Sequence, residues 1–96
     1  MSKTYYVYIM TNTSRATLYT GVTGDLSQRI HQHKEGNGSK LTSKYKTTTL
    51  VYAKAFKYVN DAIAFEKQIK NGPRRRKIKQ IEENNPNWDD LSETVR

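Results

Sequence analysis

Two short aromatic and β-branched segments, separated by a short polar stretch, constrain the fold of this chain most. Residues 5–10 and residues 17–23 are rich in tyrosine, valine, isoleucine and threonine, a composition typical of strands. The polar residues 11–16 lie between them. So short a connection predicts that the two strands form an antiparallel hairpin.

Side-chain alternation sorts this hairpin into two faces. Tyr6, Tyr8 and Met10 share one face of the first strand, and Tyr19 shares a face of the second strand with Gly21. A glycine inside a strand weakens it and often marks a close approach by a ligand or by backbone. We therefore assign Gly21 a structural role beside the two tyrosines.

Cap and breaker residues divide the rest of the chain. Asp25 is a good N-cap, Asn60 another, and Pro73 suits the first position of a helix. In chain order we expect a helix from 25 to about 35, a strand over 49–56, a helix over 61–70 and a helix from 73 to about 83. The order ββαβαα predicts an α/β (α+β) fold, a small three-stranded antiparallel sheet flanked by helices.

The chain length predicts one domain. With 96 residues the core is thin, and we place a single domain at residues 1–91, anchored at its end by Trp88 and Leu91, and a short tail at 92–96. The absence of cysteine excludes disulfides and thiolate zinc sites and is compatible with a reducing compartment. No apolar run approaches the roughly 18 residues of a membrane span or resembles a signal peptide, so we expect a soluble, cytoplasmic protein without a membrane partner.

The charge is strongly positive and unevenly distributed. Seventeen Lys and Arg against nine Asp and Glu give a net charge of +8. Residues 36–60 and 67–79 contain no acidic residue, whereas acids gather near the C-terminus. A segregated positive face favours a polyanionic partner, nucleic acid above all. The alternative is a basic surface that serves only solubility.

Two basic segments are candidates for contact with a nucleic-acid backbone. One is the basic loop that follows the first helix, and the other begins at the end of the helix over 61–70 and continues into the last helix. The candidate nucleic-acid-binding residues are Lys40, Lys44, Tyr45, Lys46, Lys70, Arg74, Arg75, Arg76 and Lys77. A solvated helix face is the competing interpretation of the second segment.

Two polar side chains lie on the inward side of the first helix. Leu26 and Ile30 mark the face that packs on the sheet, and Arg29 lies directly beside Ile30. His33 follows Arg29 by one helical turn, so the two side chains stack on one side of the helix.

A carboxylate lies in the middle of the apolar stripe of the next helix. Glu66 comes one turn after Ala62 and three residues from both Ile63 and Ile69, so it points at the sheet. A carboxylate there is costly unless it is paired or bound to a metal. One interpretation is a structural Arg29–Glu66 ion pair. The other is a catalytic cluster of Tyr8, Tyr19, Arg29, His33 and Glu66 in one cleft.

The order and spacing of these residues resemble those of the GIY-YIG nuclease superfamily. Residues 7–9 followed by residues 18–21 are similar to the paired motif that names it, and Arg29, His33 and Glu66 match the residues that follow. The resemblance covers about residues 3–91 and is to small stand-alone bacterial members of uncharacterised role.

The chain departs from the family pattern in three places. Tyr6 stands where the name implies glycine, and Thr20 where it implies isoleucine, but both tyrosines of the motif are kept. The asparagine that many members place after the glutamate has no clear counterpart, and Asn71 and Asn85 are the candidates.

The resemblance implies an enzyme, a phosphodiesterase of the endonuclease type, with one divalent cation, Mg²⁺ or Mn²⁺, held by Glu66. It implies that Tyr8, with Tyr19 as the alternative, takes the proton of the attacking water, and that Arg29 orients the phosphate. His33 relays the proton of the tyrosine or hydrogen-bonds the phosphate. Substrates would be nucleic acid, DNA favoured over RNA, in repair or processing, with a homodimer or a targeting partner as further expectations. A non-catalytic nucleic-acid-binding module with the same fold is the alternative function.

Overall fold

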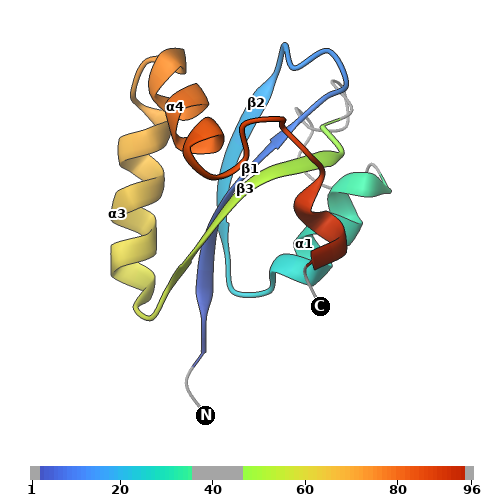
Figure 1. Ribbon diagram of the computed structural model, residues 1–96. Helices are drawn as coiled ribbons and strands as arrows, with labels where there is room; N and C mark the ends of the chain where they lie inside the picture. The colour runs from blue at the N-terminus through green and yellow to red at the C-terminus, as the bar shows by residue number, and fades with distance from the viewer. Residues whose placement is uncertain (1–2, 36–46, 95–96) are drawn as a thin grey trace.

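A central antiparallel sheet with helices on both faces organises the protein (Figure 1). The computed structural model describes residues 3–35 and 47–94. Its elements are β1 (Tyr5–Thr11), β2 (Leu18–Thr23), α1 (Leu26–Lys34), β3 (Thr49–Phe56), α3 (Val59–Lys70), α4 (Arg74–Asn84) and the 3₁₀ helix η1 (Leu91–Thr94). The predicted three-stranded sheet flanked by helices and the order ββαβαα are therefore confirmed.

The strand order β2-β1-β3 makes β1 the central strand, antiparallel to both neighbours. Tyr8 therefore has Gly21 as its partner on one side and Ala53 on the other. The register with β3 shifts after Ile9, which pairs with Tyr52, because the next residue of β1 pairs with Leu50. Val51 is thus the extra residue of a β-bulge.

The two faces of the sheet carry two separate core clusters. Tyr8, Met10, Leu26, Ile30 and Leu50 form the cluster under α1. Ile9, Val51, Tyr52, Ile69, Ile81 and Trp88 form the cluster under α3 and α4. The bulge explains why both Val51 and Tyr52 face α3 and α4 although they are adjacent in the sequence.

The segment after α4 passes from one face of the sheet to the other. Asn85 is buried, and its Nδ2 donates to the Val51 carbonyl at 3.1 Å and to the Asp89 carbonyl at 2.9 Å. Its Oδ1 accepts from the Asp89 backbone N–H at 3.0 Å. Leu91 then packs against the cluster under α1. The C-terminal segment is therefore fixed to the sheet by hydrogen bonds and by apolar contact.

Two predicted helix starts are wrong. Helix α3 begins at Val59, with Tyr58 in extended backbone as its N-cap, so Asn60 lies inside the helix and caps nothing. Pro73 is the N-cap of α4 with an extended ψ of 155°, not its first residue. Tertiary packing, not a side-chain cap, fixes both starts, since neither N-cap residue makes a capping hydrogen bond. Asp25 does cap α1, because its side chain accepts from the Gln28 N–H.

Among residues 3–35 and 47–94, no helix has the length and apolar character needed to span a bilayer.

Candidate active site

Tyr8 lies at the centre of the site, on the central strand. Its side chain is fully buried, and its hydroxyl crosses the backbone of β2 at Gly21. A Cβ atom at Gly21 would lie 2.6 Å from Tyr8 Oη, well inside van der Waals contact. Gly21 therefore leaves the space that the phenol occupies, which is the close approach that a glycine in a strand predicts.

His33 reaches the same hydroxyl from α1. Its ring is 2 % exposed, and Nε2 lies 3.2 Å from Tyr8 Oη. The ring of Tyr19 completes the group, with centroids 5.2 Å from His33 and 6.2 Å from Tyr8. Two tyrosines from adjacent strands and a histidine from the covering helix thus meet at one point.

Arg29 acts on this group through its charge. Burial raises the pKa of Tyr8 to about 12, and the neighbouring Tyr19 adds to the increase, while the Arg29 guanidinium opposes both. The helix places Arg29 one turn before His33, on the side that faces the tyrosines. Among the described residues, the Arg29 guanidinium is the positive charge that lowers the pKa of the Tyr8 phenol.

His33 is a neutral imidazole with an unused nitrogen. Burial lowers its pKa below the ordinary value of 6.5, and the positive charge of Arg29 lowers it further. Nδ1 is buried and has no hydrogen-bond partner among the described residues. A neutral ring can donate or accept a hydrogen bond at Nε2 according to its tautomer, so the histidine holds the Tyr8 hydroxyl in place.

Glu66 comes from the helix layer on the other face of the sheet. Its side chain is only 13 % exposed, and the ion pair found for it is with Lys70, where Nζ lies 3.9 Å from a carboxylate oxygen. Within the described ranges the ion pairs do not include Arg29 with Glu66, so the structural pair considered above is absent. Helix α3 packs on β1 and β2, the strands that carry the tyrosines.

The structure thus brings together four of the five predicted catalytic residues, namely Tyr8, Tyr19, Arg29 and His33. No hydrogen bond or ion pair joins Glu66 to any of these four within residues 3–35 and 47–94. The same residues contain no group of three or more His, Cys, Asp or Glu side chains able to hold a metal ion. Any cation at Glu66 therefore takes most of its ligands from water and substrate.

The candidate nucleic-acid-binding residues divide into two groups. Lys40, Lys44, Tyr45 and Lys46 lie outside the described residues. Lys70 ends α3, and Arg74, Arg75, Arg76 and Lys77 form the first turn of α4, all exposed except the half-buried Lys77. Arg74 donates to the Arg15 carbonyl at 2.6 Å, so part of this stripe holds the β1–β2 loop against α4.

The two candidate asparagines have different environments. Both polar atoms of the Asn85 amide bond to the backbone, Nδ2 to the carbonyls of Val51 and Asp89 and Oδ1 to the Asp89 N–H. Asn85 is therefore a structural residue. Asn71 is exposed and forms the C-cap of α3. Of the two, only Asn71 has a side chain accessible to a substrate.

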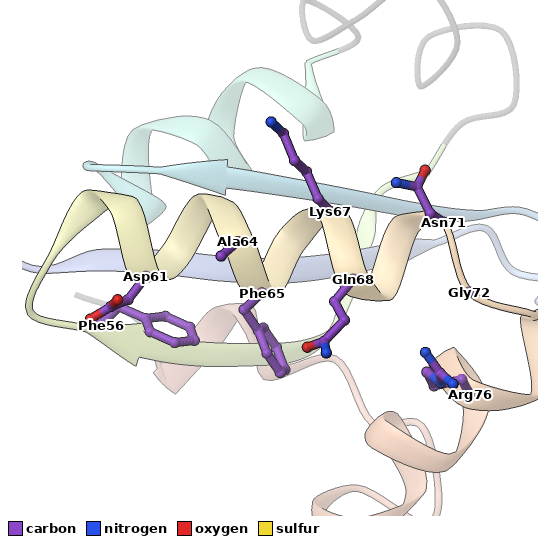
Figure 2. Close-up of a pocket in the computed structure, with 9 residues that line it drawn as sticks. All are labelled: Phe56, Asp61, Ala64, Phe65, Lys67, Gln68, Asn71, Gly72 and Arg76. Carbon is purple, nitrogen blue, oxygen red and sulfur yellow. The ribbon is translucent and has the colours of Figure 1, made fainter.

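A groove between α3 and α4 escaped the sequence analysis. It has a volume of about 660 Å³, and Phe56, Phe65, Gln68 and Arg76 are among its lining residues (Figure 2). The sequence signal that could have indicated the groove is the spacing of Phe65 and Gln68. They are three residues apart and so lie together on the side of α3 that is directed away from Glu66. Only the packing of α3 beside α4 shows that these side chains line a concave surface.

The protein is a small α/β domain in which a phenol, an imidazole and a guanidinium gather on one face of a three-stranded sheet. Residues 4–79 match the family model described as the GIY-YIG catalytic domain. The chain belongs to the GIY-YIG family, and the resemblance inferred from the motifs is confirmed.

Relatives of similar length share this sequence over most of their chains. The chain is 38 % identical over 79 residues to a UPF0213 protein of Staphylococcus haemolyticus, covering 82 % of this chain and 95 % of the relative. It is 32 % identical over 87 residues to a UPF0213 protein of Lacticaseibacillus paracasei, and this match covers 91 % of this chain and 97 % of the relative.

A solved structure has the same fold. The solution NMR structure of a UPF0213 protein from Bacillus halodurans superposes with a TM-score of 0.59 and 30 % identity. The match covers 92 % of this chain and 93 % of that one, so it extends over both layers of helices.

Proposed function

We propose that this protein is a divalent-metal-dependent endonuclease that hydrolyses phosphodiester bonds of nucleic acid, DNA in preference to RNA. The observation that carries the proposal is the Tyr8–His33 contact beside Arg29, in a chain that matches a catalytic-domain family. The net charge of +8 supports a polyanionic substrate. Repair or processing of nucleic acid are settings that such an activity suits.

Glu66 is the residue that would hold Mg²⁺ or Mn²⁺. Its carboxylate is largely buried, and the nearest cation, Lys70 Nζ at 3.9 Å, is beyond hydrogen-bonding distance. A buried carboxylate so weakly paired is stabilised by a bound cation. Mg²⁺ is commonly held by one or two carboxylates plus water and substrate phosphate, so a single glutamate fits. When bound, the ion would neutralise the scissile phosphate and the leaving oxygen.

Proton transfer in this proposal passes through Tyr8 and His33. With a pKa of about 12, Tyr8 is protonated at neutral pH and cannot act as a preformed phenolate. It can take the proton of the attacking water only as its own proton leaves. His33 Nε2, at 3.2 Å and on a neutral ring, is the acceptor for that proton.

Arg29 has the remaining role. Its guanidinium can bind a phosphate through two parallel hydrogen bonds and stabilise the charge that develops in the transition state. The same charge lowers the pKa of Tyr8 and disfavours a second positive charge on His33. The arginine therefore favours loss of the phenolic proton, and by the same charge it opposes the residence of that proton on His33.

One observation favours the alternative function, a nucleic-acid-binding module without turnover. The high pKa of Tyr8 is what a buried, inert tyrosine would also show. A binder of this kind would keep the fold and the basic surface and would need neither Glu66 nor a metal.

Replacing Glu66 by glutamine tests the proposal. We expect the variant to fold and bind nucleic acid but to lose cleavage by about 100-fold or more, since the carboxylate charge that holds the ion is gone. The measurement is cleavage of single-stranded, duplex and branched DNA and of RNA, with Mg²⁺, Mn²⁺ or EDTA. Glu35→Gln, which neutralises an exposed glutamate at the C-cap of α1, is the matched control and keeps wild-type cleavage.

Cleavage that requires both a metal and Glu66 supports the nuclease and identifies its substrate. Salt-sensitive binding without cleavage of any substrate contradicts it and leaves the binding module. Equal cleavage by wild type and Glu66→Gln contradicts the role of Glu66 alone. Because one site cuts one strand, cleavage of both strands of a duplex would require a second copy or a targeting partner.

A further inference from the structure

The groove between α3 and α4 combines aromatic rings with amide and basic side chains. Figure 2 shows Phe65 and Gln68 on one side of α3, Phe56 from the end of β3 beside Phe65, and Arg76 of α4 beyond Gln68, near Gly72. The rings of Phe56 and Phe65 have centroids 5.4 Å apart, and both side chains are half-buried. The volume of about 660 Å³ lies in the range of roughly 300–1,000 Å³ found for small-molecule sites.

The charges around these rings select an anionic ligand. Lys54 Nζ lies 4.7 Å from the Phe65 ring centroid and 5.5 Å from that of Phe56. Lys67 and Arg76 line the groove, against one acid, Asp61. An aromatic pair among basic side chains is the combination with which proteins bind single-stranded nucleic acid, because every base has a face that stacks and every nucleotide has a phosphate.

We infer that this groove is a subsite for an unpaired nucleobase of the nucleic-acid strand that the protein binds. The base stacks on the Phe56–Phe65 pair in the place of the Lys54 ammonium, which lies over both rings, while the Gln68 amide and the Asp61 carboxylate offer partners to its polar edge. Lys54 and Arg76 are then available to the flanking phosphates. This inference rests on the proposed function, since it assumes that the polyanionic partner is nucleic acid.

The place of the groove on α3 connects it to the candidate active site. Phe65 precedes Glu66 directly, and the two side chains leave the helix on different sides, one lining the groove and the other directed inward. The width of an α-helix, roughly 10–12 Å, separates the two sides. A strand with a base in the groove therefore passes Glu66 within a few nucleotides. The preferred substrate is one with an unpaired segment beside the bond that is cut.

Phe65→Leu tests the subsite, because leucine keeps apolar contact with the core cluster and removes the stacking face. The probes are fluorescein-labelled oligothymidylate, its RNA counterpart, a duplex and an abasic strand of the same length, all in EDTA so that no cleavage occurs. We expect affinity for the two base-containing single strands to fall roughly 5- to 30-fold, in line with the loss of one stacked base. Affinity for the duplex and the abasic strand stays unchanged.

Two further variants keep the outcome interpretable. Phe65→Tyr retains an aromatic ring and restores binding of single strands. Tyr58→Leu removes an exposed aromatic that does not line the groove, and leaves binding as in the wild type. An equal loss for the duplex and the abasic strand, or no loss at all, overturns the inference. Because these measurements need no metal and no cleavage, they are independent of the Glu66 result, which decides the nuclease activity.

Discussion

The position of the Tyr8 phenol depends on the absence of a side chain at Gly21. The Tyr8 hydroxyl occupies the volume where a side chain of residue 21 would begin, with Oη 2.6 Å from a Cβ built there. The phenol cannot yield easily, because its ring is fully buried and its hydroxyl contacts His33. A glycine is therefore required at position 21 by the position of the Tyr8 side chain on the adjacent strand, not by the backbone conformation of residue 21.

Replacing Gly21 by alanine should displace the Tyr8 ring. We expect a loss of about 1–3 kcal/mol in the free energy of unfolding, the usual cost of overpacking, together with loss of cleavage. Urea denaturation and a cleavage assay on the same preparation measure both effects. Gly72→Ala is the control, because the nearest atoms there, in the Arg76 side chain and at the Gln68 carbonyl oxygen, lie 3.2 Å away or farther, a milder overlap than at Gly21. Retention of full activity in Gly21→Ala would show that the phenol need not lie over β2.

At the scale of one element, α1 determines the protonation of the site. The helix buries His33 and brings Arg29 one turn away on the same side. Both effects disfavour the charged imidazole, so the folded pKa lies below 6.5, the value in the unfolded chain. The unfolded chain therefore binds more protons than the folded one between these two pKa values.

Stability should accordingly fall on the acid side in a way that depends on His33. The contribution of this residue is present above about pH 6.5 and is lost as the pH falls through the lowered pKa. The free energy of unfolding, measured by urea denaturation from about pH 7.5 down to pH 5, should decrease in wild type and remain flatter in His33→Gln. His31→Gln, which removes the exposed histidine of the same helix, should keep the wild-type slope. An identical slope in wild type and His33→Gln would contradict the buried, neutral imidazole.

At the scale of the whole molecule, the two helix layers are joined by the segment that follows α4. Asn85 bonds this segment to the bulged strand at Val51. Asp90 accepts from the Leu50 N–H at 3.2 Å and pairs with Lys34 of α1 at 3.0 Å. One short segment thus contacts β3 and α1 in succession and links the two helix layers across the sheet.

Asn85→Ala should destabilise both layers at once. Three hydrogen bonds are lost and the buried Val51 carbonyl is left without its partner, so we expect a decrease of about 2–4 kcal/mol in the free energy of unfolding. Cleavage per folded molecule should be unchanged, which distinguishes a structural asparagine from one that binds substrate. Thermal denaturation and an activity assay at low temperature give the two values. Asn71→Ala, at an exposed position, should change stability by less than about 0.5 kcal/mol.

The sequence predicts the strands better than it predicts what joins them. Period-two alternation places Tyr8 and Tyr19 correctly, and the third strand has the predicted bounds of 49–56, because local side-chain pattern determines both. The bulge at Val51 depends on pairing between distant strands, and no local signal encodes it. The role of Asn85 depends in the same way on contacts that form only when the sheet is complete.

In the candidate site, too, the sequence predicts what depends on local spacing and does not predict what depends on contacts between distant segments. Helical spacing correctly puts Arg29 and His33 on one side of α1. Spacing also shows that Glu66 points inward, but it cannot state which face of the sheet α3 covers. That choice depends on how β1 and β2 pack against two helices, and it separates Glu66 from an ion pair with Arg29.

The segment that links the layers also determines when the protein can finish folding as it is synthesised. Residues 85–91 follow every strand and every α-helix of the described fold, yet they supply contacts to both core clusters. On the ribosome, β1, β2 and α1 emerge first and can form a hairpin with one covering helix. The contacts of Trp88 and Leu91 with the two core clusters can form only after all of these elements have been synthesised.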